Sequence, residues 1–163
     1  MRPQPVQPGP GQESVWGFPR PPSIEDSTRH ILVRKNGIVL AETRSAKRVL
    51  ETSHAPTYYI PRRDVAMHHL AESSNQTFCE WKGSAMYFDL MAGGFSIQSV
   101  AWTYENPTPG FIEIRGYLAF YPDRLECYLD GEQALAQAGG FYGGWITSDV
   151  VGPFKGEPGT RNW

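Results

Sequence analysis

The sequence contains little cysteine and no long apolar run. Its 163 residues include two cysteines, Cys79 and Cys127, which form neither a disulfide framework nor a Cys-x-x-Cys pair. A membrane-spanning helix needs about 18 or more consecutive apolar residues, and no segment approaches that length. The first 12 residues lack the apolar stretch of a secretory signal. We therefore expect a cytoplasmic protein with no membrane partner and with both thiols reduced.

The chain also has little net charge. It contains 15 Lys and Arg against 17 Asp and Glu, a net charge of −2, and its mean hydropathy is −0.43. This balance excludes a strongly basic chain that binds nucleic-acid polymers and a strongly acidic, solvating one. Residues 29–63 nevertheless hold eight cationic side chains against two acidic ones. They could attract an anion, although solvated strand faces explain the same pattern.

Recognisable catalytic and metal-binding motifs are scarce. His68 and His69 are adjacent, so their side chains diverge, and no His-x-x-x-His or cysteine pair completes a site. The glycine-rich segment 139–144 lacks the Lys-Ser/Thr of a phosphate-binding loop. No Gly-x-Ser-x-Gly turn of a hydrolase occurs. We therefore expect no metal ion and no cofactor.

Proline and glycine instead divide the chain into three parts. Seven of the 14 prolines lie in the first 22 residues, and seven of the 17 glycines lie in the last 25. We predict a Pro-rich N-terminal arm over residues 1–28, a core over residues 29–135 and a Gly/aromatic-rich C-terminal arm over residues 136–163. Both arms carry too many aromatic side chains to stay solvated. We expect both to pack on the core, leaving only residues 1–10 as a free tail.

Short β-prone runs separated by turn residues dominate the core. The clearest is a hairpin, in which His30–Lys35 and Ile38–Thr43 flank Asn36-Gly37, a dipeptide that tolerates positive φ at both turn positions. A further strand is predicted at Thr57–Ile60. The remaining predicted strands are Thr77–Trp81, Ala85–Leu90, Ser96–Tyr104, Ile114–Tyr121 and Leu125–Leu129.

Two short helices are predicted between these strands. Ser45 could cap a helix over Ala46–Glu51, and Asp64 could cap one over Val65–Ala71. The whole pattern indicates a mainly β fold: a compact antiparallel small barrel or strongly bent sheet with one or two short helices, on which the arms pack.

The densest group of chemically active side chains lies between Glu51 and Asp64, in a segment stiffened by prolines. Glu51 and Asp64 are candidates for a general base or a metal ligand. Tyr59 is a candidate for the wall of a pocket, and Arg62 for an anion contact. A capping Asp64, a Glu51 that ends a helix and a Tyr59 in the core would explain the same residues.

A second group surrounds Cys79. Because side chains alternate along a strand, Cys79 and Trp81 are expected on one face, and Glu80 and Lys82 on the other. Lys82 could project into a pocket and meet an anion or a carboxylate such as Glu51. A nucleophilic thiol activated by Lys82 would require a bulge in the strand, so we expect Cys79 to be structural or to contact a ligand.

A third group lies at Ala101–Pro107. Trp102 and Tyr104 share one strand face and, with Trp81 and Tyr59, could line an aromatic pocket for a flat or apolar ligand. A simple aromatic core is the alternative.

Four segments of the chain carry distinctive motifs. They are Glu51-Thr52 with Pro56-x-Tyr58-Tyr59-x-Pro61-x-x-Asp64, Cys79-x-Trp81-Lys82-Gly83-x-Ala85, Ala101-Trp102-x-Tyr104-x-x-Pro107 and Gly116–Tyr121. Together they resemble the family called domain of unknown function 427, sometimes labelled nucleotidyltransferase-like. The likeness extends into both arms, through Glu13–Trp16 and Gly140–Thr147. Ala55 stands where the family usually has a second proline.

The resemblance implies a compact, mainly β fold and no settled reaction. Nucleotidyl transfer uses carboxylates that hold two Mg²⁺ ions, usually an Asp-x-Asp/Glu pair about ten residues after a Gly-Ser. Here Gly83-Ser84 is followed at that distance only by the isolated Asp89. We therefore do not expect that reaction.

Three functional hypotheses remain. The first is a domain that binds an unknown small molecule in an aromatic-lined pocket, with Glu51, Asp64 and Lys82 fixing its polar groups. The second is a transferase or hydrolase acting on a nucleotide or similar anion, with Lys82 as electrostatic stabiliser. The third is an interaction module whose arms engage a partner or a second copy of the chain, as a homodimer.

Overall fold

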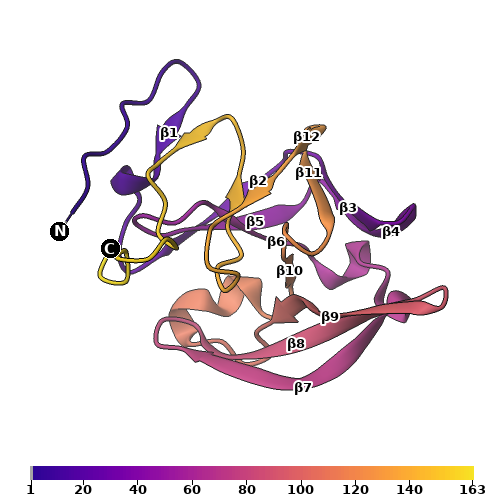
Figure 1. Cartoon of the computed structure of the whole chain (residues 1–163). Helices are drawn as coiled ribbons and strands as arrows, with labels where there is room; N and C mark the ends of the chain where they lie inside the picture. Colours follow the sequence, from indigo (N-terminus) through magenta and orange to yellow (C-terminus); the bar gives the residue numbers. More distant parts are fainter. Residues whose placement is uncertain (1) are drawn as a thin grey trace.

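Antiparallel sheets are the main regular structure of the protein. The computed structural model describes residues 2–163, and Figure 1 shows the sheets packed against one another, with the two ends of the chain on the same side. The expected mainly β class is confirmed. The sheets pack compactly, but none of those within residues 2–163 closes into a barrel.

One four-stranded sheet contains the predicted hairpin. Its order is β12-β11-β3-β4, with bounds Glu132–Gln133, Glu126–Leu129, Ile31–Lys35 and Ile38–Thr43. Asn36 and Gly37 have φ values of 49° and 78°, the left-handed conformation that a tight turn between twisted strands requires. The predicted hairpin is therefore confirmed, and Cys127 on β11 is fully buried.

The second four-stranded sheet holds the longest strands. Its order is β10-β9-β8-β7, with bounds Leu118–Phe120, Phe95–Thr103, Gly83–Ala92 and Leu70–Cys79. β7 begins seven residues before the strand predicted at Thr77–Trp81 and ends two residues earlier. Its backbone pairs with that of β8 at Leu70–Glu72 and again at Gln76–Cys79, with a shift of register between the two stretches.

A three-stranded sheet of order β2-β5-β6 connects the other two. Its strands are Ser23–Ser27, Ala46–Leu50 and Thr57–Tyr59. The helix predicted over Ala46–Glu51 is wrong, because β5 is the central strand and is paired on both sides. Ile60 and Leu118 exchange backbone hydrogen bonds of 2.7 and 2.9 Å, which join this sheet to β10.

The helical segments of the described part of the chain are four 3₁₀ turns: η1 (Val15–Gly17), η2 (Arg62–Asp64), η3 (Met67–His69) and η4 (Pro109–Ile114). The helix predicted over Val65–Ala71 is wrong. Val65 forms a bridge with Ala41 and Leu70 pairs with Leu90, so the backbone is extended on both sides of η3. Within residues 2–163, no helix has the length and apolar character needed to cross a bilayer.

The two arms pair with each other and with the core. β1 (Glu13–Ser14) runs parallel to β15 (Val150–Val151), and β13 (Leu135–Ala136) pairs with β14 (Trp145–Ile146). The packing of both arms is therefore confirmed. The free tail expected over residues 1–10 is wrong for the part described, since the Val6 N–H donates to the Gly152 carbonyl at 2.9 Å. Residue 1 lies outside the described residues.

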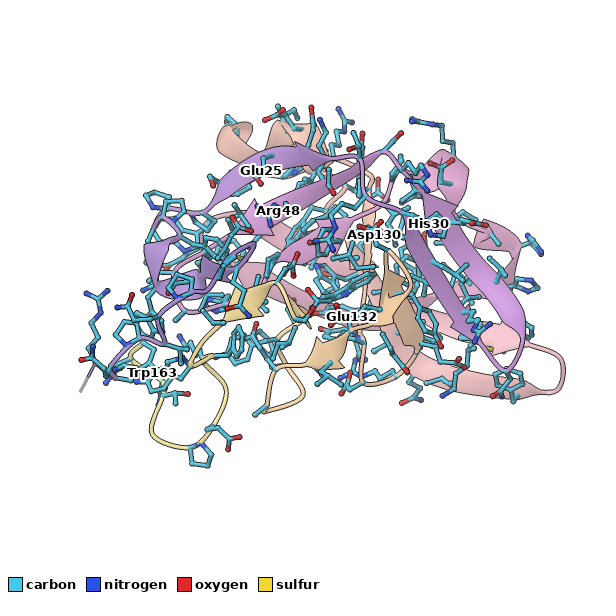
Figure 2. The ribbon with its side chains drawn as sticks, turned by 90° about the horizontal axis from the view of Figure 1, so that it is seen from above. Glu25, His30, Arg48, Asp130, Glu132 and Trp163 are labelled. Carbon is cyan, nitrogen blue, oxygen red and sulfur yellow. The ribbon has the colours of Figure 1, made fainter. Side chains whose placement is uncertain are left out.

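Charged side chains fasten the N-terminal arm to β5. Arg48 donates two hydrogen bonds to the Glu13 carboxylate, at 2.9 and 3.0 Å, a bidentate geometry that is strong and directional. It also pairs with Glu25 on β2, and Figure 2 shows these two side chains on adjoining strands. The cationic excess of residues 29–63 is partly neutralised by such internal pairs.

The core has two main apolar clusters, besides a small one formed by Val15, Phe18, Leu50 and Val150. The larger main cluster packs between the hairpin sheet and the β7–β10 sheet and includes Trp145 of the C-terminal arm. The second main cluster is rich in tyrosine and tryptophan and lies where β5 and β6 meet β8 and β9. The candidate site opens on this second cluster.

Candidate functional site

A cavity of about 330 Å³ lies over the aromatic cluster. Its size falls at the lower end of the range, about 300–1,000 Å³, that is typical of small-molecule sites. Seven of the predicted site residues line it: Glu51, Tyr59, Cys79, Trp81, Lys82, Trp102 and Tyr104. They come from β5–β6, from the β7–β8 turn and from the end of β9. The structure thus brings together three segments that are distant in sequence.

The aromatic walls are held by one another. The Trp102 indole N–H donates to the Tyr59 hydroxyl at 3.3 Å, and the Trp102 ring lies 4.6 Å from that of Tyr121. Burial raises the pKa of the Tyr59 and Tyr104 phenols above the ordinary value of 10.0. Both therefore stay neutral near pH 7 and keep a hydroxyl proton to donate.

Lys82 lies beside Cys79, contrary to the expectation from strand alternation. β7 ends at Cys79 and residues 80–82 form a turn, so the alternation of faces does not extend to Lys82. Its ammonium nitrogen is 3.7 Å from the Cys79 sulfur and 5.7 Å from the centre of the Phe111 ring. Lys82 is 9% exposed. The suggested pairing of Lys82 with Glu51 is not found.

Glu51 faces His54 instead. The His54 Nδ1 is 2.9 Å from the Thr52 carbonyl oxygen and 3.7 Å from a Glu51 carboxylate oxygen. Arg20, in the N-terminal arm, is 3.5 Å from the same oxygen. With Nδ1–H donating to Thr52, Nε2 has no partner within residues 2–163. His54 lines the cavity, which makes Nε2 the neutral base available to a ligand there.

His54 also predicts a pH dependence of stability. Burial, with smaller contributions from Lys155 and Arg20, lowers its pKa below the ordinary 6.5, although Glu51 and the Thr52 carbonyl oppose the shift. As the pH falls below about 6.5, the unfolded chain therefore binds a proton that the folded protein does not. The free energy of unfolding should then fall more steeply than in the His54→Gln variant, by up to about 1.4 kcal/mol per pH unit.

Chemical denaturation at intervals between pH 7.5 and 5 measures this difference. The other histidines are common to both proteins, so they cancel in the comparison. Parallel curves for the two proteins would mean that His54 is not held neutral by the fold.

Two predicted site residues lie outside the cavity. Asp64 accepts a hydrogen bond from the Thr43 hydroxyl at 2.7 Å. Arg62 pairs with Glu105 at 2.9 Å and donates to the Gly116 carbonyl at 3.2 Å. Both belong to η2, which fixes the path of the chain between β6 and β7.

The C-terminal arm supplies lining residues that the sequence reasoning missed. Tyr142, Gly143 and Lys155 all face the cavity, and the Tyr142 ring lies 5.3 Å from that of His54. His54 itself stood in the cluster between Glu51 and Asp64 but was not selected. The aromatic content of the arm was the available signal, although it does not indicate which surface the arm covers.

The structure offers no carboxylate cluster at this site. Within residues 2–163, no group of three or more His, Cys, Asp or Glu side chains converges as metal ligands would. The Asp-x-Glu pair of the chain, Asp130 and Glu132, lies at the β11–β12 turn (Figure 2). Asp130 accepts from Arg29 at 2.8 Å, and Glu132 accepts from Ser148 at 2.7 Å, so both carboxylates serve the fold.

A second hollow, of about 370 Å³, lies where the ends of the two arms meet. Arg2, Trp16, Arg20 and Trp163 line it, and Figure 2 shows Trp163 in this region. None of the residues selected from the sequence reaches it. We therefore take the aromatic cavity as the candidate site.

The fold and site together define a mainly β domain with an aromatic cavity that its own C-terminal arm helps to enclose. The family model described as domain of unknown function (DUF427) matches residues 23–131. Because the match covers most of the chain, the protein belongs to this family, as the sequence motifs indicated. None of the curated proteins compared with the chain matches it.

Proposed function

We propose that the protein binds a small, flat ligand in the aromatic cavity. The observation that carries the proposal is convergence: residues from β5 to β9 and from the C-terminal arm meet around one concave space. Large aromatic walls with a few polar groups are typical of small-molecule sites. The free cysteines, Cys79 and Cys127, support a reducing compartment such as the cytoplasm as the place of action.

The mouth of the cavity supports the same function. Phe78 and Phe141 line it although their side chains are 76% and 62% exposed. Exposed aromatic rings at the rim of a pocket are costly in water and gain contacts when an apolar ligand enters. Lys82, His54 and the Tyr104 hydroxyl supply polar contacts deeper in the cavity.

The five tryptophans provide the test. Each has one indole N–H, which gives a separate signal in a ¹H–¹⁵N NMR spectrum. When naphthalene-2-carboxamide is titrated, we expect the Trp81 and Trp102 signals to shift, with a dissociation constant of about 1 mM or lower for a ligand of this size. The Trp145 signal is an internal control, because its N–H is buried and donates to Phe120 at 3.0 Å.

Two outcomes would contradict the proposal. Shifts confined to Trp16 and Trp163 would place binding in the hollow between the arms. An unchanged spectrum at millimolar concentrations of naphthalene-2-carboxamide would mean that the cavity does not accept flat aromatic molecules.

The second candidate function is catalysis, as a transferase or hydrolase acting on an anionic substrate. Two observations support it: the Cys79 thiol lies beside the Lys82 ammonium, and His54 carries Nε2 as a base. Cys79, Lys82 and His54 all line the same cavity. Asp64 and Arg62 do not line this cavity, and their side chains are held by Thr43 and Glu105. Reaction of Cys79 with iodoacetamide faster than a free thiol, and slower in Lys82→Met, would favour this candidate.

A further inference from the structure

Lys82 is distinguished from the other charged residues by its burial. Among the Asp, Glu, Lys and Arg residues within residues 2–163, Lys82 is the one that is buried. The partly buried arginines Arg48 and Arg29 have carboxylate partners: Arg48 binds Glu13 and Glu25, and Arg29 binds Asp130. Lys82 has none within residues 2–163. Its contacts are a thiol sulfur, which is a weak acceptor, and the face of an aromatic ring.

An ammonium group in this environment lacks a counter-ion. Burying a charge is costly unless it is paired and hydrogen-bonded. Three N–H donors of Lys82 meet a single weak acceptor within the protein, and the side chain lines the cavity. A ligand with anionic oxygens in the cavity would supply the missing partner.

The other charged groups around the cavity favour the same ligand charge. Glu51 is paired with Arg20 and lies 3.7 Å from the neutral His54. Glu80 also lines the cavity but is exposed on the turn. Lys155, from the C-terminal arm, lines the cavity and also has no carboxylate partner within residues 2–163. The cavity lining therefore contains two lysines without carboxylate partners in the described part of the chain, one glutamate that is paired with Arg20, and a second glutamate, Glu80, that is exposed to solvent.

We propose that the ligand is a flat aromatic or apolar molecule bearing one anionic group, a carboxylate or a phosphate, which Lys82 binds. The inference rests on the proposed function and specifies the ligand class. A single anionic group matches one buried ammonium and a cavity of about 330 Å³. The aromatic walls formed by Tyr59 and Trp102 bind the flat part of the molecule. A charge-assisted hydrogen bond to Lys82 should make an anionic ligand bind about 10- to 100-fold more tightly than a neutral ligand of the same shape.

Three probes with the same ring system test the proposal: naphthalene-2-carboxylate, 2-naphthyl phosphate and the neutral naphthalene-2-carboxamide. We expect at least one anionic probe to bind the wild-type protein about 10- to 100-fold more tightly than the carboxamide. The ratio between the two anions identifies carboxylate or phosphate as the preferred group. In Lys82→Met this preference for anions should disappear, so that the anionic probes bind no more tightly than the carboxamide.

Lys35→Met is the matched control. It removes the same charge from β3, outside the cavity, and should retain the preference. The free Lys82→Met protein should unfold at the same or a higher temperature than the wild type, because it loses an unpaired buried charge. If the Lys82→Met protein does not fold, the Lys82→Gln variant takes its place in the binding measurements.

The outcomes separate the two proposals. Equal binding of the three probes by the wild type, or a preference that survives in Lys82→Met, would overturn the role of Lys82 and leave the aromatic cavity standing. Failure of all three probes to bind would overturn both proposals.

Discussion

Replacing Trp145 with alanine is expected to lower the free energy of unfolding by about 3–5 kcal/mol, as for other buried aromatic residues. Trp145 is 1% exposed, and its ring centre lies 5.2 Å from that of Tyr58. Its indole N–H donates to the Phe120 carbonyl at 3.0 Å, and that buried carbonyl oxygen would lose a partner. For a chain of this length the melting temperature should fall by roughly 6–20 °C.

Thermal and chemical denaturation measure this loss, and Phe141→Ala is its matched control. Phe141 belongs to the same arm, but its side chain is 62% exposed, so its removal should change stability by less than about 0.5 kcal/mol. Trp145→Phe should fall between the two, since it retains an aromatic ring and loses only the hydrogen bond and part of the packing. A Trp145→Ala protein as stable as Phe141→Ala would show that the C-terminal arm is not part of the folded core.

The packing of the C-terminal arm on the core, which Trp145 tests, was predicted from the aromatic composition of the arm. Predictions of strands and helices from local sequence were correct in some segments and wrong in others. Asn36-Gly37 predicted its hairpin correctly because the turn conformation is a property of those two residues alone. Residues 46–51 suggested a helix, since Ser45 could cap its first turn. The structure makes them a central strand, because hydrogen bonds to β2 on one side and β6 on the other outweigh a weak intrinsic preference.

The candidate site was predicted in part for a similar reason. Tyr59, Trp102 and Tyr104 were chosen as pocket walls because aromatic residues gather in short motifs, and they do line one cavity. The position of Lys82 could not be predicted from the alternation of side chains between the two faces of a strand, because β7 ends at Cys79 and Lys82 lies beyond it. The contribution of Tyr142 depends on how the C-terminal arm folds back over β6 and β9. No periodic pattern in the sequence encodes that path.

Several glycines of the arm permit its return path, and Gly143 is the one that lies against the Trp102 wall of the cavity. A Cβ atom at Gly143 would lie 1.9 Å from the Cη2 atom of Trp102 and 2.7 Å from its Cζ3. The Trp102 ring cannot easily retreat, because it packs on Tyr121 at 4.6 Å and its N–H donates to Tyr59 at 3.3 Å. Gly143 therefore permits the arm to close over a wall of the cavity.

Gly143→Ala is accordingly expected to impair both stability and binding. Overpacking at such a contact costs about 1–3 kcal/mol, and the displaced Trp102 ring should weaken binding of naphthalene-2-carboxylate by about tenfold or more. Gly110→Ala is the matched control, because no atom lies within 4 Å of its added methyl group. The control should retain wild-type binding and a melting temperature equal to or slightly above that of the wild type.

Comparing the two measurements separates the roles of the arm. Lost binding together with a shifted Trp102 indole signal would mean that the arm determines the shape of the ligand site, so that the cavity belongs to the whole chain and not to residues 23–131 alone. Lost stability with unchanged binding would mean that the arm only covers the core, and the part played by Tyr142 and Lys155 in the site would have to be abandoned. Because Gly143 itself contributes no side chain, either result reports on the position of the backbone and not on a contact made by the residue replaced.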